Sequence, residues 1–261
     1  MRKYLWIGGN LDNYLKKEIV LNNGKILSSY ISQTNIIEGI ERNSDIVFDS
    51  INSIRLDFFP KYKKLNIKRH VWSHKDCSFD VSVGYLNIKY LAIYLKTLSL
   101  VKEAKNWAKI NKCNEVVIFV FGLHSPYLKA ALKIKKIIKN VELIVVHPDL
   151  PLFMDGSPSL VKRILKKIDW FQIKKMNFKV DKHILYSKHM ADYLQLDEKK
   201  WIVMEGSINF SDVGPVIKDK PTTKIIVMYS GVIGKMYGIM NLVEAIISLG
   251  SGYELWLYGG G

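Results

Sequence analysis

The sequence predicts an α/β protein built on parallel sheets, and three observations support this prediction. Apolar strand-like runs alternate with segments of helical period, and Val and Ile fill these runs without polar alternation. A glycine-studded turn also joins a strand to an amphipathic helix in the last forty or so residues. Strands separated by helices form parallel sheets that are covered on both faces, which is why their residues are uniformly apolar.

The strands are expected at residues 4–7, 46–48, 53–58, 116–121, 143–147, 182–186, 201–204, 224–229 and 254–258. The helical period predicts helices at residues 87–111, 125–140, 159–178, 188–194 and 238–249. Residues 209–223 carry Gly214, Pro215 and Pro221 without any hydrophobic period, which is typical of a linker. We therefore expect a first domain over 1–208, a linker over 209–223 and the beginning of a second domain over 224–261.

Composition narrows the range of partners. In 261 residues, 39 Lys and Arg face 24 Asp and Glu, for a net charge of +15, which suits nucleic acid, an anionic membrane or phosphorylated substrates. Cys77 and Cys113 are too few for a disulfide framework, so we expect a reducing cytoplasm. The apolar run at the start of the sequence is too short for a signal peptide, and no window is long enough to span a bilayer.

Polar residues follow several predicted strands of the first domain. Gly8, Gly9 and Asn10 come directly after the first strand, as either a tight turn or a loop that contacts substrate. His124 follows the strand at 116–121 and precedes a helix, so it either faces the cleft or only caps that helix. Asp149 follows the next strand, where it either lines the same cleft or accepts backbone N–H bonds in a rigid exit loop. Ligands of open α/β sheets bind at this carboxyl edge.

The second domain opens with a candidate phosphate-binding turn. Gly231, Gly234 and Gly238 allow close approach of the backbone to a ligand, and the helix that begins near Ile239 offers free N–H groups to an anion. Lys235 adds a positive charge suited to a diphosphate. Neither P-loop spacing nor a Gly-x-Gly-x-x-Gly pattern is present, which argues against a kinase or a dinucleotide-binding protein.

Two basic segments, residues 60–75 and 159–178, combine lysines with apolar residues. Such segments either dock on anionic lipid or form a solvated basic face above a packed core. Nucleic-acid binding is the weaker alternative, because the basic residues are dispersed and no helix-turn-helix, RRM or zinc pattern occurs.

Several separated motifs occur together in a familiar order. They are Gly8-Gly9, Asp149-Leu-Pro151, Ser187-Lys-His-Met190, Trp201-Ile-Val-Met-Glu-Gly206, Tyr229-Ser-Gly231, Tyr237-Gly238-Ile239 and Leu242-Val-Glu-Ala245. In these motifs the chain resembles the retaining family 4 glycosyltransferases of the GT-B fold, in particular bacterial enzymes of capsular and exopolysaccharide assembly. The resemblance extends over essentially the whole chain.

The resemblance implies a Rossmann-like acceptor domain followed by a Rossmann-like domain that binds a nucleotide-diphosphate sugar, of which residues 224–261 supply the first βαβ unit. It implies no metal and no cofactor besides the nucleotide sugar as co-substrate. The implied catalytic residues are His124 and Asp149. The implied binding residues are Gly8, Gly9 and Asn10 for the acceptor, and Ser230, Gly231, Gly234, Lys235 and Gly238 for the donor diphosphate.

The chain departs from the family at three points. Val232 stands where many members have an arginine, and Tyr237 stands where a lysine often precedes the glycine. The paired glutamates of the family lie beyond the equivalent of Gly261, so we expect an acceptor domain and an incomplete donor domain. The expected function is transfer of a sugar to a lipid-linked saccharide by a peripheral protein at the inner face of the plasma membrane. The alternative is a non-catalytic chain of the same family that binds an acceptor or a partner.

Overall fold

A computed structural model describes residues 2–26, 28–150, 160–207 and 223–260. The chain divides into two compact units, Met1–Phe210 and Ser211–Gly261, each described here by itself. Most of the predicted linker at 209–223 lies outside the described residues.

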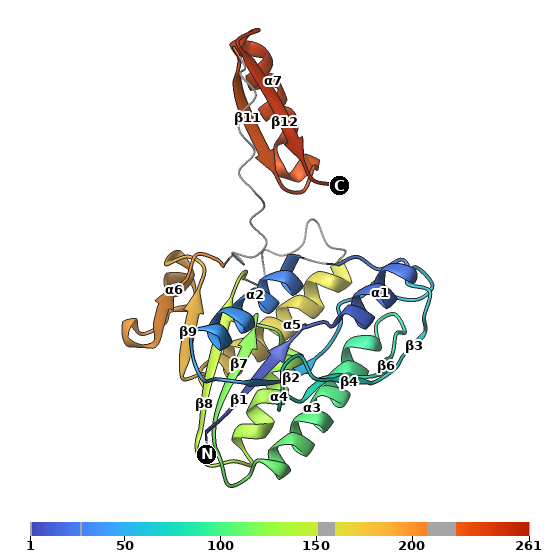
Figure 1. The fold of residues 1–261 in the computed structure, drawn as a ribbon, viewed down its shortest axis with the longest axis vertical. Helices are drawn as coiled ribbons and strands as arrows, with labels where there is room; N and C mark the ends of the chain where they lie inside the picture. Colours follow the sequence, from blue (N-terminus) through green and yellow to red (C-terminus); the bar gives the residue numbers. More distant parts are fainter. Residues whose placement is uncertain (1, 27, 151–159, 208–222, 261) are drawn as a thin grey trace. The chain divides into compact units, whose positions relative to one another are not determined.

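The first unit is built on an eight-stranded sheet in the order β10-β9-β8-β7-β1-β2-β5-β4 (Figure 1). The strands are β1 (Arg2–Gly8), β2 (Phe48–Asn52), β4 (His70–Trp72), β5 (Asp80–Ser82), β7 (Glu115–Phe121), β8 (Val141–His147), β9 (Lys182–Leu185) and β10 (Trp201–Val203). All neighbours pair in parallel except β4, which runs antiparallel to β5 at the edge. The predicted α/β fold class with a largely parallel sheet is confirmed.

Helices cover both faces of this sheet. They are α1 (Asn13–Leu21), α2 (Ser28–Arg42), α3 (Ala92–Ile110), α4 (Ser125–Lys135), α5 (Leu160–Asn177) and α6 (His189–Leu194). Successive residues of a strand point to opposite faces. Leu5 and Ile7 of β1 accordingly join the cluster packed under α3, α4 and α5, while Trp6 joins the cluster packed under α2. Helices therefore pack against β1 on both faces of the sheet.

Three smaller elements complete the first unit. A two-stranded antiparallel ribbon of β3 (Asn66–Ile67) and β6 (Tyr85–Leu86) lies beside the start of α3, and a 3-10 turn, η2 (Glu198–Lys200), precedes β10. Packing of α1 uses a separate small cluster that includes Leu15, Ile19 and Ile54.

The second unit contains β11 (Ile225–Ser230), the 3-10 turn η4 (Lys235–Tyr237), α7 (Ile239–Leu249) and β12 (Tyr253–Tyr258). Its two strands pair in parallel over six residue pairs, from Ile225 with Tyr253 to Ser230 with Tyr258. This is one βαβ unit, in the order that the sequence predicts.

One predicted strand was wrong, and several elements were missed. Residues 53–58 are not a strand, because the chain leaves the sheet after Asn52. The backbone N–H of Arg55 donates instead to the hydroxyl of Tyr30, at 2.6 Å. In addition, the helices α1 and α2 and the short strands β3, β4, β5 and β6 were not expected from the sequence. Both helices mix polar and apolar residues; α2 packs its buried face on the sheet, whereas α1 packs in the small cluster with Ile54.

Candidate functional site

Three of the predicted site residues lie at one edge of the sheet. Gly8 ends β1, His124 lies three residues after β7, and Asp149 lies two residues after β8. Because β8, β7 and β1 are neighbours and run in parallel, their carboxyl ends meet at this edge. Asp149 is exposed there, and the chain from Pro151 to residue 159 lies outside the described residues.

The turn Gly8-Gly9-Asn10 is buried, and side chains of Gln33 and Asn52 bind its backbone. The N–H of Gly9 donates to Oε1 of Gln33 at 2.7 Å, and the N–H of Asn10 donates to Oδ1 of Asn52 at 2.8 Å. A Cβ on Gly8 would meet Oε1 of Gln33 at 2.1 Å, and one on Gly9 would meet the ring of Tyr30 at 2.7 Å. A side chain at either glycine would therefore displace Gln33 or Tyr30, and hydrogen bonds from the N–H groups of Gly9 and Asn10 hold the turn in place.

His124 directly precedes α4, and its ring packs edge-on against Tyr127 with 5.7 Å between ring centroids. Burial lowers the pKa of His124 to about 4, and the positive charges of Arg55 and Lys96 add to this effect against the opposing charge of Asp169. The imidazole is therefore neutral at physiological pH, so one ring nitrogen donates a hydrogen bond while the other accepts.

Arg55 and Lys96 bring two cations close to this histidine. Lys96 reaches from α3 and donates from Nζ to the carbonyl of Ile54 at 2.8 Å, with its ammonium 4.7 Å from the ring centroid of Tyr85. Burial and the charge of Arg55 lower the pKa of Lys96 to about 8. Tyr127 closes the group, since its hydroxyl accepts from Oγ of Ser53 at 3.0 Å. The sequence did not indicate Arg55 or Lys96, because each lies inside a segment assigned there to regular structure.

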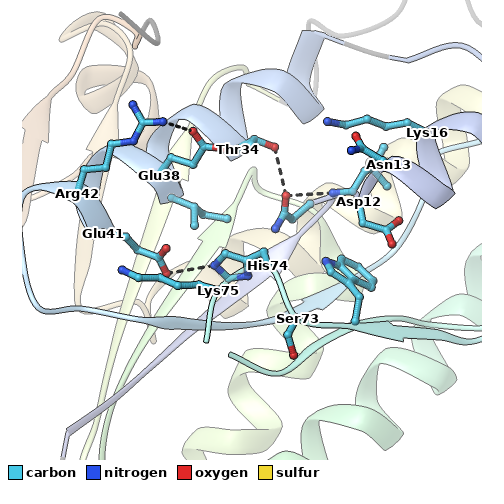
Figure 2. Close-up of a pocket in the computed structure, with 14 residues that line it drawn as sticks. Asp12, Asn13, Lys16, Thr34, Glu38, Glu41, Arg42, Ser73, His74 and Lys75 are labelled. Carbon is cyan, nitrogen blue, oxygen red and sulfur yellow. Dashed lines mark hydrogen bonds and ion pairs between the residues drawn. The ribbon is translucent and has the colours of Figure 1, made fainter. Parts of the chain in front are cut away.

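A pocket of about 440 Å³ opens beside Asn10, between α1, α2 and the loop after β4 (Figure 2). The residues that line it are Asn10, Leu11, Asp12, Asn13, Lys16, Thr34, Ile37, Glu38, Glu41, Arg42, Trp72, Ser73, His74 and Lys75. Neutral hydrogen-bonding groups, charged groups of both signs and one indole ring therefore share the cavity. Of the residues predicted from the sequence, Asn10 lines this pocket.

Asn10 is fixed in place by its neighbours. Its Oδ1 accepts from the N–H of Leu11 at 3.0 Å and from Oγ1 of Thr34 on α2 at 3.2 Å. Asp12 caps α1 by accepting from the N–H of Leu15 at 2.8 Å, and its other oxygen lies 2.9 Å from Nε2 of His70. A helix cap followed by an apolar period was the signal that would have revealed α1 in the sequence.

His74 forms the opposite wall of the pocket, where Figure 2 shows its ring facing Glu41. Its Nδ1 lies 2.7 Å from Oδ2 of Asp80, and its Nε2 lies 3.2 Å from Oε1 of Glu41. Burial lowers the pKa of His74, but hydrogen bonds to the two carboxylates and their charges outweigh that effect and raise it to about 9. This imidazolium therefore ties α2 to β5 through the loop that carries it.

In the second unit, the candidate diphosphate residues lie between β11 and α7. Ser230 ends β11, and the N–H of Gly231 donates to the carbonyl of Tyr258 at 2.9 Å. Gly238 has φ of 68° and directly precedes α7, which begins at Ile239 as expected. Lys235 is exposed in η4, which starts after Gly234.

The turn after β11 touches the turn after β12. A Cβ on Gly259 would lie 1.8 Å from the carbonyl oxygen of Gly231, and the backbone of Gly259 has φ of 145°. The two glycine turns therefore meet at the carboxyl end of this sheet.

Comparison with known proteins gives the fold. No protein-family profile and no curated protein sequence matches the chain. Among solved structures, all of the chain aligns with sucrose-phosphate synthase from Thermosynechococcus elongatus, at a TM-score of 0.57 and 14% identity. The chain spans 63% of the length of that structure, which is a GT-B glycosyltransferase. The protein therefore has the Rossmann-like α/β fold of GT-B glycosyltransferases.

Proposed function

We propose that the protein is a glycosyltransferase that transfers a sugar, with retention, from a nucleotide-diphosphate sugar to a lipid-linked saccharide in capsular or exopolysaccharide synthesis. The observation that carries the proposal is the neutral His124 beside Arg55 and Lys96, at the carboxyl edge of a sheet with the GT-B fold. Described helices include none that is long and apolar enough to cross a membrane.

His124 and Asp149 act on the acceptor side in this proposal. The neutral imidazole of His124 exchanges hydrogen bonds with sugar hydroxyls, and the exposed carboxylate of Asp149 accepts from them. Arg55 and Lys96 stabilise negative charge on the lipid phosphate of the acceptor.

The donor and the acceptor contact different residues. In the second unit, the N-terminus of α7 and the exposed Lys235 hold the diphosphate, with the turn from Ser230 to Gly234 beside them. In the first unit, the pocket beside Asn10 takes the acceptor saccharide, because amide, hydroxyl and carboxylate groups bind sugar hydroxyls and the ring of Trp72 offers an apolar wall. We propose that no metal takes part.

The test measures sugar transfer by the natural gene product, with a panel of nucleotide sugars, extracted lipid-linked saccharides and a chelator. We expect His124→Ala to lower kcat about 100- to 1000-fold, because a positioned group at the reacting sugar is lost. The rate should show no titration of His124 between pH 5 and 7, a range that lies above the pKa of His124, about 4, and below that of Lys96, about 8. His189→Ala, which removes an exposed histidine on α6, should leave kcat unchanged.

Full activity of His124→Ala would contradict the proposed catalytic role, and strict dependence on a divalent metal would contradict metal-free transfer. If no nucleotide sugar gives product while a lipid-linked saccharide still binds in calorimetry, the non-catalytic alternative holds instead.

A further inference from the structure

Exposed apolar side chains gather around the start of α3. Six of them form what we call the α3 patch: Phe58, Phe59, Ile88, Leu91, Tyr94 and Leu98. Their exposed fractions run from 36% for Phe58 to 62% for Tyr94. Single exposed apolar residues are ordinary on a protein surface, whereas a contiguous group marks an interaction site.

Backbone contacts place the parts of the α3 patch side by side. The N–H of Phe59 donates to the carbonyl of Asn87 at 3.2 Å, and Nδ2 of Asn87 donates to the carbonyl of Asp57 at 2.8 Å. Leu91, Tyr94 and Leu98 follow at spacings of three and four, so they share one face of the helix. The loop and the helix therefore present one surface.

Lysines border this apolar surface. The exposed face of α3 continues from Leu98 to Lys102, Lys105 and Lys109. Lys89 at the other end lies 5.2 Å from the ring centroid of Tyr90, and Lys63 is exposed in the neighbouring loop. By contrast, Lys61, Lys64 and Arg69 of the predicted basic segment at 60–75 are paired with Asp57, Glu18 and Glu103.

We propose that the α3 patch docks the protein on the surface of an anionic membrane. An apolar stripe that holds tyrosine and is flanked by lysine suits the boundary between lipid headgroups and acyl chains, and anionic lipids attract the lysines. A protein partner fits less well, because lysine is depleted in protein interfaces.

Docking at this surface would bring a lipid-linked acceptor to the site. Residues 54–59 run directly from the carboxyl end of β2 to the patch, passing Arg55. Lys96 lies on α3 between Tyr94 and Leu98 and binds the carbonyl of Ile54. Only this link to the acceptor rests on the proposed function; attachment to a membrane can be measured without any turnover.

The test is co-flotation of the whole chain with vesicles of phosphatidylcholine, alone or mixed with phosphatidylglycerol. We expect binding to the anionic vesicles only, and weaker binding as salt screens the lysines. Tyr94→Ser together with Leu98→Ser should lower the partition coefficient about tenfold or more, since two apolar groups no longer enter the interface. Both residues are exposed, so the variant should keep its thermal unfolding temperature.

The matched control is Ile168→Ser with Phe171→Ser, which removes two exposed apolar side chains from α5 and should leave partitioning unchanged. Loss of binding in this control with retention in the Tyr94/Leu98 variant would move the contact to α5 and overturn the proposal. Equal binding to uncharged vesicles would overturn it as well.

A dimer in solution that the Tyr94/Leu98 variant abolishes would show that a second copy covers the patch, which would overturn the proposal too. A normal rate with a water-soluble acceptor, alongside failed flotation, would leave the proposed transfer standing.

Discussion

Gln33 links three parts of the first unit through one buried side chain. Its Oε1 accepts from Nε1 of Trp6 at 3.1 Å and from the N–H of Gly9 at 2.7 Å, while its Nε2 donates to the carbonyl of Ser29 at 2.9 Å. The position of the turn after β1 thus depends on a residue of α2. No space remains beside Gly8 for even a methyl group.

We predict that Gly8→Ala lowers the free energy of unfolding by about 1–3 kcal/mol, because the new Cβ displaces Gln33 from its hydrogen bonds. Urea unfolding measures this change. Gly39→Ala is the control, since Gly39 lies in α2 and a Cβ added there would have no atom within 4 Å. That substitution should raise the free energy of unfolding by about 0.5–1 kcal/mol. Equal stability of Gly8→Ala and the wild type would refute the packing argument.

At the scale of elements, the imidazolium of His74 holds α2 against β5. A histidine whose pKa is higher in the folded state contributes stability that is complete below its unfolded pKa of about 6.5 and is lost as pH rises through about 9. We predict that His74→Gln costs about 3 kcal/mol at pH 6, and that the difference from the wild type shrinks toward zero above pH 9. Urea unfolding at several pH values measures this difference, and a pH-independent difference would contradict the charged network.

A buried pair of histidines joins β8 to β9, and its pH dependence is opposite to that of His74. Nε2 of His147 lies 2.9 Å from Nδ1 of His183, and both rings are buried. Burial, with a smaller repulsion from His183, lowers the pKa of His147 to about 3; burial and the charge of Lys200 lower that of His183 to about 4, against the opposing charge of Asp181. Below about pH 6.5 both histidines therefore become protonated in the unfolded chain but stay neutral in the folded protein.

We predict that the free energy of unfolding falls by about 1.4 kcal/mol per pH unit for each of these histidines between about pH 6 and 4. A variant with His147→Leu and His183→Leu should show a flatter pH dependence over this range, measured against the wild type by urea unfolding. If the double variant kept the slope of the wild type, the two histidines would have the same pKa in the folded and the unfolded state, which would contradict the prediction.

The sequence predicted the central elements well and the site only in part. Buried parallel strands such as β7 and β8 contain apolar runs rich in Val and Ile, at residues 116–121 and 143–146, so hydrophobicity locates them without tertiary information. The pocket beside Asn10 escaped prediction because α1 and α2 supply much of its wall, and these helices were not expected. The charge of Arg55 acts on His124 because the chain leaves the sheet after β2, which no local pattern indicates.

On the scale of the whole molecule, the basic residues behind the net charge of +15 fall into paired and exposed groups. Some basic residues are paired with carboxylates, such as Arg2 with Glu115 and Lys182 with Glu142. Others, such as Lys102, Lys105 and Lys109, follow one exposed helix face and remain available to an anionic surface. The surface lysines and the two cations near His124 therefore act at different places: the former in attachment, the latter in the site.

The contact between Gly231 and Gly259 has a consequence for how the second unit tolerates random mutation. At position 259 even alanine would force the two turns apart, and its backbone angle disfavours any L-residue. Gly252 and Gly260 have no atom within 4 Å of the corresponding Cβ position. In a library that replaces each of these glycines with all other residues, selected for folded protein, position 259 should be recovered as glycine alone, while positions 252 and 260 accept many side chains.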